Sequence, residues 1–286
     1  MSHASALRGH LASGGTVLMP GVWDPMSALL AEQAGFSTLF LSGFALSGTL
    51  LGEPDIGIIG QSEMADAARR VCSAVPGTQV VVDADTGYGD DSDIARTVAL
   101  WEGAGAAGMF LEDQEWPKKC GHMEDKRVVS REEWLGRLRT VLRCRSELHV
   151  TARTDALAVE GIDEAIERAR MARDLGVDAV FVEAPRSVAD LERIASEVDG
   201  VVLVANMVEK GKTPLLTPGE LAALGFRLVV SPLSGLLSAA RALGDAYAHL
   251  HREGTMRDVL GSMTSFDGFT ELVGLEKHLA AGPDGR

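Results

Sequence analysis

Short apolar runs alternate with longer amphipathic segments along most of this 286-residue chain. The runs that predict strands cover residues 16–19, 38–42, 79–83, 108–112, 149–154, 179–182, 201–205 and 228–230. Apolar residues at helical spacing predict helices over residues 25–34, 62–74, 92–104, 131–145, 163–175 and 188–198. Strands that alternate with helices form parallel sheets, and nearly continuous apolar strands are buried on both faces. The pattern therefore predicts a parallel sheet covered by helices.

Eight strands with seven or eight helices in under 300 residues predict an α/β protein of the (β/α)₈ type, a TIM barrel. A doubly wound open sheet is the alternative, but no glycine-rich dinucleotide loop follows the first strand. No Pro/Ser-rich linker or block of like charge divides the sequence. We therefore expect residues 1–286 to form one barrel domain with a helical C-terminal tail from about residue 255.

Polar residues gather at the C-terminal ends of the predicted strands, where the strands of a barrel converge on one mouth and active sites form. These residues are Ser42, Asp83, Asp85, Glu112, Arg153, Asp155, Glu183 and Asn206. Taken singly, Ser42 could satisfy a turn and Asp155 could cap a helix. As a set, they predict an active site at the mouth of the barrel.

The segment Asp83-Ala84-Asp85 carries two carboxylates on the same side of an extended chain. Two carboxylates so close together need a cation or a shared proton, and oxygen ligands without a His or Cys cluster favour Mg²⁺ or Mn²⁺ over zinc. Because Mg²⁺ keeps several waters, one aspartate suffices as a direct ligand, while the other aspartate and Glu112 can hold the waters. A solvated turn is the alternative explanation for this segment alone.

The stretch Lys118-Lys119-Cys120-Gly121-His122 places a thiol and an imidazole beside two ammonium groups. Neighbouring cations favour the thiolate, so we expect Cys120 to be more acidic and more reactive than an ordinary buried cysteine. A solvated basic loop with an inert cysteine is the alternative. Arg153 offers a planar fork that suits a substrate carboxylate, with a surface salt bridge as its alternative role. The loop that carries Asn206 and Thr213 can hydrogen-bond a second carboxylate.

The net charge of −14 and the pI near 4.9 argue against nucleic acid or an anionic membrane as the main partner. A metal and a few local cations could still bind an anionic substrate. Three cysteines without paired spacing fit a reducing compartment. The N-terminus lacks the apolar core of a signal peptide, and no apolar run reaches the roughly 18 residues that a membrane span needs. We therefore expect a cytoplasmic globular protein.

Seven segments spread over nearly the whole chain resemble the isocitrate lyase and phosphoenolpyruvate mutase superfamily. They are residues 41–43 (Leu-Ser-Gly), 52–55 (Gly-Glu-Pro-Asp), 82–89 (Val-Asp-Ala-Asp-Thr-Gly-Tyr-Gly), 111–114 (Leu-Glu-Asp-Gln), 117–122 (Pro-Lys-Lys-Cys-Gly-His), 151–156 (Thr-Ala-Arg-Thr-Asp-Ala) and 205–209 (Ala-Asn-Met-Val-Glu). Several of these motifs are specific, and their order along the chain strengthens the assignment.

The resemblance implies a barrel whose last helix packs on a partner subunit, in a homotetramer built as a dimer of dimers. It implies Mg²⁺ held by Asp83 and Asp85, with Glu112 in the outer shell. The substrate, a 2-oxo or 2-hydroxy acid, would chelate the metal beside Ser42, Gly43 and Arg153. The implied substrate-binding residues are Ser42, Gly43, Phe44, Asp55, Gly121, Arg153, Asn206, Thr213 and Pro232.

The Lys-Lys-Cys-Gly-His loop resembles that of lyases that cleave a carbon–carbon bond, such as methylisocitrate and dimethylmalate lyases. By similarity, Cys120 would protonate the carbanion left when the bond to the 2-oxo acid breaks. His122 and Glu183 would tune or relay that proton, Arg153 would help to stabilise the oxyanion, and the loop would act as a lid. Phosphoenolpyruvate mutase and phosphonopyruvate hydrolase carry a different loop without this cysteine.

Departures from the methylisocitrate lyases narrow the expected substrate. Phe40 replaces a tyrosine, Phe44 replaces a small residue, and Leu237 and Phe266 stand at positions of arginines that bind further carboxylates. A tricarboxylate without these cations would leave buried charge unpaired, at a cost of roughly several kcal/mol. We therefore expect Mg²⁺-dependent cleavage of a malate-like, substituted 2-hydroxy dicarboxylate to a 2-oxo acid and a carboxylate. The alternatives are a carboxyphosphonoenolpyruvate phosphonomutase, an oxaloacetate decarboxylase and a non-catalytic acid-binding barrel.

Overall fold

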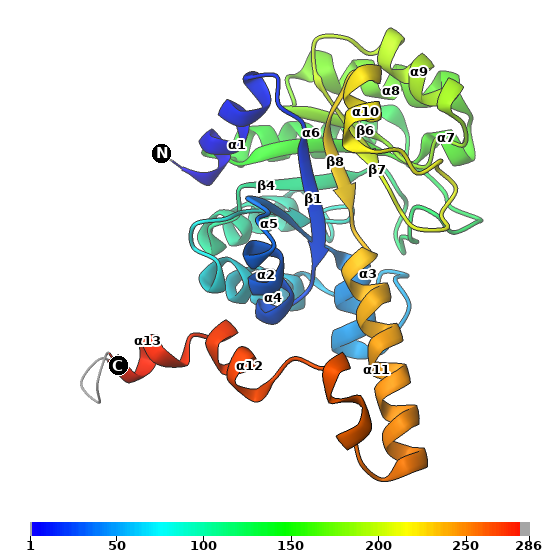
Figure 1. Ribbon diagram of the computed structural model, residues 1–286. Helices are drawn as coiled ribbons and strands as arrows, with labels where there is room; N and C mark the ends of the chain where they lie inside the picture. The colour runs from blue at the N-terminus through cyan, green and yellow to red at the C-terminus, as the bar shows by residue number, and fades with distance from the viewer. Residues whose placement is uncertain (1, 281–286) are drawn as a thin grey trace.

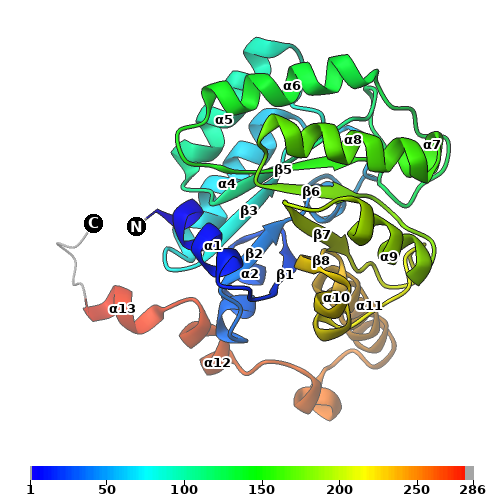
Figure 2. The ribbon, with the colours of Figure 1, turned by 90° about the horizontal axis from the view of Figure 1, so that it is seen from above.

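Eight parallel strands close into a barrel in the computed structural model, which describes residues 2–280 (Figure 1 and Figure 2). The strands are β1 (Val17–Val22), β2 (Thr38–Leu41), β3 (Gln79–Asp83), β4 (Gly108–Glu112), β5 (His149–Thr154), β6 (Ala179–Val182), β7 (Val202–Asn206) and β8 (Phe226–Ser231). Each strand pairs with the next along the chain, and β8 pairs with β1. The predicted (β/α)₈ barrel is therefore confirmed, and the open-sheet alternative is wrong.

Inward-facing apolar side chains fill the interior of the barrel. They are Val17, Met19, Phe40, Val81, Phe110, Ala179, Phe181, Val204, Leu228 and Val230. The ring of Phe110 lies between two other aromatic rings, with centroid distances of 5.0 Å to Phe40 and 5.8 Å to Phe181. Because these three rings also line the hollow at the mouth, they separate the barrel core from the candidate site.

Seven helices surround the strands (Figure 2). They are α2 (Pro25–Gln33), α4 (Gln61–Ala74), α5 (Asp91–Ala104), α6 (Arg131–Cys144), α8 (Ile162–Leu175), α9 (Val188–Glu197) and α10 (Pro218–Leu224). Fully buried Trp101 and Trp134 fill the layer between helices and strands. The six predicted helices are present, whereas the sequence pattern does not predict α10, because its seven residues span barely two turns.

A further helix, α1 (His3–Ala12), closes the N-terminal end of the barrel. Its Leu7 and Leu11 side chains insert into the inner core. Arg8 anchors the helix, because its guanidinium donates to Asp178 at 2.7 Å and to the backbone carbonyl of Leu148 at 2.9 Å. The opposite end, where the strands finish, carries the short helices α3 (Gly43–Leu46) and α7 (Ala156–Val159) and the π-helical turn η1 (Ser47–Leu51).

The long helix α11 (Ser234–Glu253) begins after β8 and runs away from the barrel (Figure 1). Within the described chain no residue of α11 is buried, and four apolar side chains on it are between 44% and 65% exposed: Leu237, Leu243, Tyr247 and Leu250. The 3₁₀ helix η2 (Arg257–Ser262) and the helices α12 (Phe266–Leu272) and α13 (Leu275–Ala280) follow it. No helix between residues 2 and 280, α11 included, combines the length and apolar character that crossing a bilayer requires.

Candidate active site

A cavity of about 50 Å³ lies at the C-terminal mouth of the barrel. Most of the predicted site residues line it: Ser42, Phe44, Asp55, Asp83, Cys120, Gly121, His122, Arg153, Glu183, Asn206 and Pro232. Gly43, Asp85, Glu112 and Thr213 are not among its lining residues. The strand ends thus bring together side chains that lie far apart in the sequence, as the barrel geometry requires.

Three of the residues outside the lining lie close behind it. A Cβ atom on Gly43 would lie 3.0 Å from Asp83 Oδ2, so only a glycine lets this carboxylate approach freely. The amide of Asp85 donates to Asp83 Oδ1 at 3.2 Å, and the amide of Glu112 donates to the Asp85 carbonyl at 2.9 Å. Thr213 is buried, and its hydroxyl has no hydrogen-bond partner in the described chain.

Lys118 neutralises part of the acidic cluster. Its ammonium lies 2.6 Å from both Asp55 and Asp85, and all three side chains are buried. Burial raises the pKa of Asp85 to about 7, although the Lys118 ammonium acts in the opposite direction. Burial also raises the pKa of Glu112 well above its usual range, against the opposing influence of Arg153. In the sequence Lys118 stands out only as a neighbour of the thiol, and no local pattern indicates its contact with Asp55 and Asp85.

The carboxylates fit a hard divalent cation that keeps several waters. Asp83, Asp85 and Glu112 offer only oxygen donors, and Glu112 Oε1 is buried without a hydrogen-bond partner. Among residues 2–280, however, no three His, Cys, Asp or Glu side chains converge closely enough to form a complete protein cage for a metal. The arrangement therefore favours few direct protein ligands, with water filling the remaining positions.

Arg153 is held at the end of β5 by three carboxylates. Its Nε lies 2.9 Å from Asp155 and 3.4 Å from Glu112, and its Nη2 lies 3.4 Å from Glu183. The guanidinium also lies 5.5 Å from the centre of the Phe181 ring. Since the side chain is only 13% exposed and lines the cavity, a solvent-exposed surface bridge does not describe it.

The loop between β4 and α6, residues 113–130, covers one side of the cavity and is called the lid loop below. The Gln114 side chain makes two hydrogen bonds with the Lys119 backbone. Its Nε2 donates to the Lys119 carbonyl at 2.8 Å, and its Oε1 accepts the Lys119 amide at 2.9 Å. The Cys120 amide donates to the Asp55 carbonyl at 3.1 Å. A Cβ atom on Gly121 would lie 2.6 Å from both Arg153 Nη2 and Glu183 Cγ, so the loop packs directly on these groups.

The predicted acidity of Cys120 is wrong. Burial raises the pKa of this thiol to about 11 and outweighs the hydrogen bond from the His122 amide, which lowers it. The two neighbouring ammonium groups point elsewhere, Lys118 to two aspartates and Lys119 to the Glu124 carbonyl. Cys120 is therefore a protonated thiol at neutral pH and can act as an acid rather than as a nucleophile.

His122 directs its Nε2 atom toward Glu183. The Lys212 amide donates to Nδ1 at 3.0 Å, which assigns the ring proton of the neutral form to Nε2. Nε2 lies 3.5 Å from Glu183 Oε1, and burial lowers the pKa of the imidazole. Asn206 Nδ2 lies 3.3 Å from both Glu183 oxygens. This arrangement can pass a proton between the imidazole and the carboxylate.

Two of the weaker sequence interpretations have clear structural outcomes. The Ser42 hydroxyl accepts the Ala45 amide at 3.3 Å, so it does satisfy the turn that begins α3. Asp155 precedes α7 but makes no capping hydrogen bond with its side chain; it binds Arg153 and Lys126 instead. Lys126 is absent from the predicted site because nothing in the sequence marks it as the lysine that turns inward.

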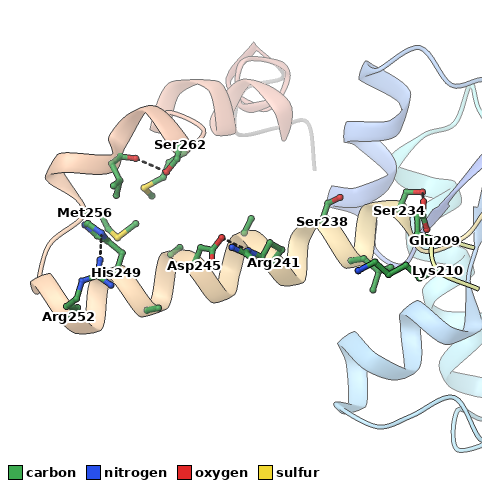
Figure 3. Close-up of a pocket in the computed structure, with 16 residues that line it drawn as sticks. Glu209, Lys210, Ser234, Ser238, Arg241, Asp245, His249, Arg252, Met256 and Ser262 are labelled. Atoms are coloured by element: carbon green, nitrogen blue, oxygen red, sulfur yellow. Dashed lines mark hydrogen bonds and ion pairs between the residues drawn. The ribbon is translucent and has the colours of Figure 1, made fainter.

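The residues at the positions of the missing arginines lie away from the cavity. Leu237 belongs to α11, and Phe266 begins α12 with 83% of its surface exposed. Leu237 lines a different, larger hollow of about 1200 Å³ between α11 and the segment that follows it (Figure 3). Within that hollow Arg241 pairs with Asp245, and Arg252 contacts His249. It contains none of the predicted site residues.

A closed barrel with this buried acid, thiol and arginine cluster at its mouth belongs to the class of (β/α)₈ enzymes. The family profile described as phosphoenolpyruvate phosphomutase matches residues 7–251. The chain therefore belongs to this family, within the isocitrate lyase and phosphoenolpyruvate mutase superfamily, and it is an enzyme of that superfamily. The resemblance stated from the seven motifs is confirmed. Enzymes of this superfamily depend in general on a divalent metal ion.

Individual relatives cover nearly the whole chain. "Carboxyvinyl-carboxyphosphonate phosphorylmutase, chloroplastic" of Arabidopsis thaliana is 45% identical over 267 residues, which are 92% of this chain and 78% of the relative. "2,3-Dimethylmalate lyase" of Eubacterium barkeri is 38% identical over 279 residues, 97% of this chain and 96% of the relative. A crystal structure of 2,3-dimethylmalate lyase superposes with a TM-score of 0.94 at 32% identity, covering 100% of this chain and 98% of the other. The structure of oxaloacetate acetylhydrolase in complex with the inhibitor 3,3-difluorooxalacetate superposes with a TM-score of 0.93 at 36% identity. The match covers 98% of this chain and 96% of the other.

Proposed function

We propose that the protein is a Mg²⁺-dependent lyase that cleaves a carbon–carbon bond in a malate-like, substituted 2-hydroxy dicarboxylate, yielding a 2-oxo acid and a carboxylate. The observation that carries the proposal is the position of the Cys120 thiol. It lines the same small cavity as Arg153 and Glu183, on a loop that packs on both of them. A protonated thiol at this place suits the delivery of a proton to a carbanion. The similarity to a dimethylmalate lyase over almost the full length of both chains agrees with this reaction.

Asp83, Asp85 and Glu112 would hold the Mg²⁺ ion, partly through water. When bound there, the ion supplies a Lewis acid that stabilises negative charge on the 2-oxygen of the substrate. Mn²⁺ has the same preference for oxygen ligands and could replace it. Arg153 then binds the carboxylate next to that oxygen, since its charged fork already faces the cavity.

The residues of the lid loop and of β6 account for the protons. The substrate hydroxyl gives its proton to the Glu183–His122 pair, and the carbon–carbon bond breaks with its electron pair left on the carbon beside the second carboxylate. The Cys120 thiol, protonated because of its pKa of about 11, transfers its proton to that carbon. The Glu183–His122 pair then returns the hydroxyl proton to the sulfur. The overall reaction neither gains nor loses a proton.

The walls of the cavity favour a small substrate with an apolar substituent. Four phenylalanines line it, Phe40, Phe44, Phe110 and Phe181, together with Val208 and Leu233. Among the described lining residues, Arg153 is the only Arg or Lys. A tricarboxylate would therefore bring more negative charge than the pocket can pair, whereas an alkyl-substituted malate places its substituent against the aromatic wall.

Two other functions remain as alternatives to the lyase. The 45% identity to the Arabidopsis phosphorylmutase favours a carboxyphosphonoenolpyruvate phosphonomutase. The similarity to oxaloacetate acetylhydrolase favours an enzyme that acts on oxaloacetate, by hydrolysis or by the decarboxylation expected from the sequence. The non-catalytic acid-binding barrel is ruled out, because the chain belongs to an enzyme family and carries the complete set of Asp85, Glu112, Cys120 and Arg153.

We also propose that the protein works as a homotetramer, a dimer of dimers, in which α11 packs on a partner subunit. The exposed apolar side chains of α11 support this arrangement, since a single chain leaves them in water. Its three cysteines are free, which agrees with a cytoplasmic location, and its charge of −14 disfavours nucleic acid and anionic membranes as partners.

A substrate screen with Mg²⁺ tests the function. Substituted malates, citrates, oxaloacetate and phosphonates are incubated with the enzyme, and products are followed by 2-oxo acid release and by phosphorus NMR. Release of a 2-oxo acid from a substituted malate is expected, with loss of activity on chelation and recovery on addition of Mg²⁺. A new carbon–phosphorus signal would support the phosphonomutase instead. The absence of turnover on every compound would contradict the lyase and both alternatives.

Two cysteine variants test the role of the thiol. Cys120→Ala should lower kcat by about 10²- to 10⁴-fold, because general acid catalysis contributes that much, while Mg²⁺ binding measured by calorimetry stays unchanged. Cys144→Ala is the matched control, since this exposed cysteine at the end of α6 lies outside the cavity lining. Full activity in Cys120→Ala would exclude the proposed proton transfer.

A further inference from the structure

We propose that Lys126 is a positioning residue that latches the lid loop to the Arg153 side of the pocket through Asp155. Lys126 lies near the far end of the loop and outside the cavity lining. It would not touch the substrate; it would act by holding Gly121, and with it Cys120 and His122, against the catalytic groups. The catalytic role of the positioned residues rests on the proposed function, whereas the contact between Lys126 and Asp155 can be tested without any substrate.

The Lys126 ammonium is buried with two acceptors. Its side chain is 1% exposed, and Nζ donates to Asp155 Oδ1 at 2.5 Å and to the backbone carbonyl of Gly121. One acceptor belongs to the lid loop itself and the other lies at the C-terminal end of β5. The ammonium therefore closes the segment from Gly121 to Lys126 into a tight unit and ties that unit to the barrel. A buried ammonium is stable only because both contacts replace its lost hydration.

Asp155 is shared between Lys126 and Arg153. Its carboxylate accepts Arg153 Nε at 2.9 Å and Nη2 at 3.2 Å in addition to the ammonium. The side chain is wholly buried, so its negative charge needs these two cations. Closing the loop therefore supplies Asp155 with its second cation, and opening it leaves Arg153 as the single cationic partner among the described contacts. Loop closure is therefore coupled to the orientation of Arg153 through their shared partner Asp155.

Asp155 can serve as a fixed anchor because it is held from behind. Its amide donates to Asp113 Oδ1 at 2.8 Å. Asp113 is itself fully buried and accepts the Thr154 hydroxyl and Arg168 Nη1, the latter at 3.1 Å. Arg168 also donates to the carbonyl of Val129 at 2.8 Å, which places it under the end of the lid loop. The anchor is thus held by Asp113, the residue that directly follows β4, and by Arg168 of α8, and the moving part is the lid loop beyond Asp113.

The other contacts of the lid loop hold different points. Gln114 holds the Lys119 backbone, Lys118 pairs with Asp55 and Asp85, and the Cys120 amide donates to the Asp55 carbonyl. From the β7 side, Lys212 contacts both Glu124 and the His122 ring. In the described part of the chain, none of these contacts reaches Asp155. Loss of Lys126 should therefore release the Gly121 carbonyl and loosen the segment from Gly121 to Lys126 where it meets Arg153 and Glu183, while these other contacts remain.

Cysteine alkylation measures loop opening without any need for substrate. The enzyme is treated with iodoacetamide, and the modification rate of each cysteine is read by peptide mass spectrometry. Cys120 reports on the loop. Cys72 in α4 is the matched reference, because burial raises its pKa to about 11 as well, and Cys144 reports on the reagent. The variants are Lys126→Met, Lys126→Arg as the rescue that keeps the charge, and Arg127→Gln as the control, an exposed neighbour paired with Glu115.

The latch predicts that Lys126→Met raises the Cys120 rate by about tenfold or more, a change of ~1.4 kcal/mol in the free energy of opening. The alkylation rates of Cys72 and Cys144 should not change. In the Lys126→Arg and Arg127→Gln variants, the Cys120 rate should stay within about threefold of wild type. An unchanged Cys120 rate, or a parallel rise at Cys72 that indicates general loosening, would overturn the proposal. Should Lys126→Met not fold, Asp155→Asn removes the anchoring charge instead and must accelerate Cys120 in the same way.

Steady-state kinetics then test what the latch does for the reaction. On any substrate that wild type turns over, Lys126→Met should lower kcat by about 10²-fold, because a small misplacement of catalytic groups has this effect, with KM within about threefold. A rise in KM with unchanged kcat would refute a positioning role. If wild type turns over nothing, the lyase proposal fails while the alkylation result still decides the latch.

Discussion

At the scale of single residues, Gly121 is the point where lid and barrel meet most closely. It has an ordinary negative φ, so its requirement for glycine comes from space alone. A Cβ atom would approach Arg153 Nη2 and the Glu183 side chain to 2.6 Å, well inside van der Waals contact. The two side chains cannot both retreat, because Arg153 is held by Asp155 and Glu183 by Asn206. The loop has to move instead.

Gly121→Ala should therefore hold the lid open. We expect kcat/KM to fall by about 10²-fold, because the thiol and the imidazole are displaced from the substrate. The melting temperature should change little, since the loop can open without unfolding the barrel. Gly136→Ala is the matched control: this glycine lies inside α6 with nothing within 4 Å of an added Cβ, so stability should rise by about 1 kcal/mol with activity unchanged. Wild-type activity in Gly121→Ala would contradict the packing argument.

The Cys120 thiol shows what single-residue reasoning from sequence can and cannot give. The pattern of strand ends places Arg153 and Glu183 at one mouth, the family resemblance adds the thiol, and all three line one pocket. The pKa of the thiol depends on where the neighbouring ammonium groups point, and adjacent residues in a loop need not face the same way. Lys118 turns to Asp55 and Asp85, partners that are distant in sequence. For the same reason Lys126 and its link to Asp155 cannot be found without the fold.

At the scale of elements, α1 is held to the barrel by charge as well as by apolar contacts. Asp178 accepts Arg8 Nε at 2.7 Å and the Val150 amide at 2.8 Å, and it also pairs with Arg145. Burial alone would raise the pKa of Asp178, but these partners and His149 lower it from 3.8 to about 2. A carboxyl whose pKa is lower in the folded than in the unfolded protein stabilises the fold fully when the pH is above the unfolded-state pKa. That stabilisation is lost as the pH falls toward the folded-state pKa.

The stabilisation from Asp178 should therefore be complete above about pH 5 and fade between about pH 4 and pH 2. Asp178→Asn is expected to lower the free energy of unfolding by about 1–2 kcal/mol near pH 6, after allowance for partial exposure and screening by salt. Urea unfolding of both proteins between pH 6 and pH 3 should show this difference shrinking as the pH falls. Asp174→Asn, an exposed carboxylate beside Arg173, should show no such trend. A difference that grows on acidification would contradict the assignment.

The elements differ in how far the sequence predicts them. The eight strands are predicted with end points within three residues of those observed, because strands buried on both faces are written as continuous apolar runs. The six longer barrel helices follow from their apolar period. Helices α1, α10 and α11 are outside the predicted ranges, although α1 and α11 span 10 and 20 residues. Tertiary contacts such as those of Leu7 and Arg8 decide the place of α1. The apolar pattern of a segment indicates that it is buried, but it does not indicate which other element covers it.

At the scale of the whole molecule, a single chain leaves the apolar side chains of α11 exposed to water. Leu237, Leu243, Tyr247 and Leu250 are largely exposed on this twenty-residue helix, and they are called the α11 face here. The helix leaves the barrel (Figure 1). A net charge of −14 on each copy opposes association, so apolar burial has to supply the attraction in the proposed assembly. The twofold symmetry usual in homo-oligomers would use such a face twice in each pair.

Leu243→Glu tests this assembly at the centre of the α11 face, where Leu243 is 52% exposed. Losing one buried leucine costs about 2 kcal/mol per copy, and a symmetric pair loses it twice, so Kd should rise by about 10³-fold or more. Sedimentation equilibrium should show a tetramer for wild type and smaller species for the variant. Leu215→Glu makes the same change at a leucine that is 57% exposed but lies outside α11, and it should leave the mass unchanged. A monomeric wild type, or a Leu243→Glu variant of undiminished mass, would exclude α11 as the contact, because a glutamate cannot enter an apolar interface without the cost of burying its charge.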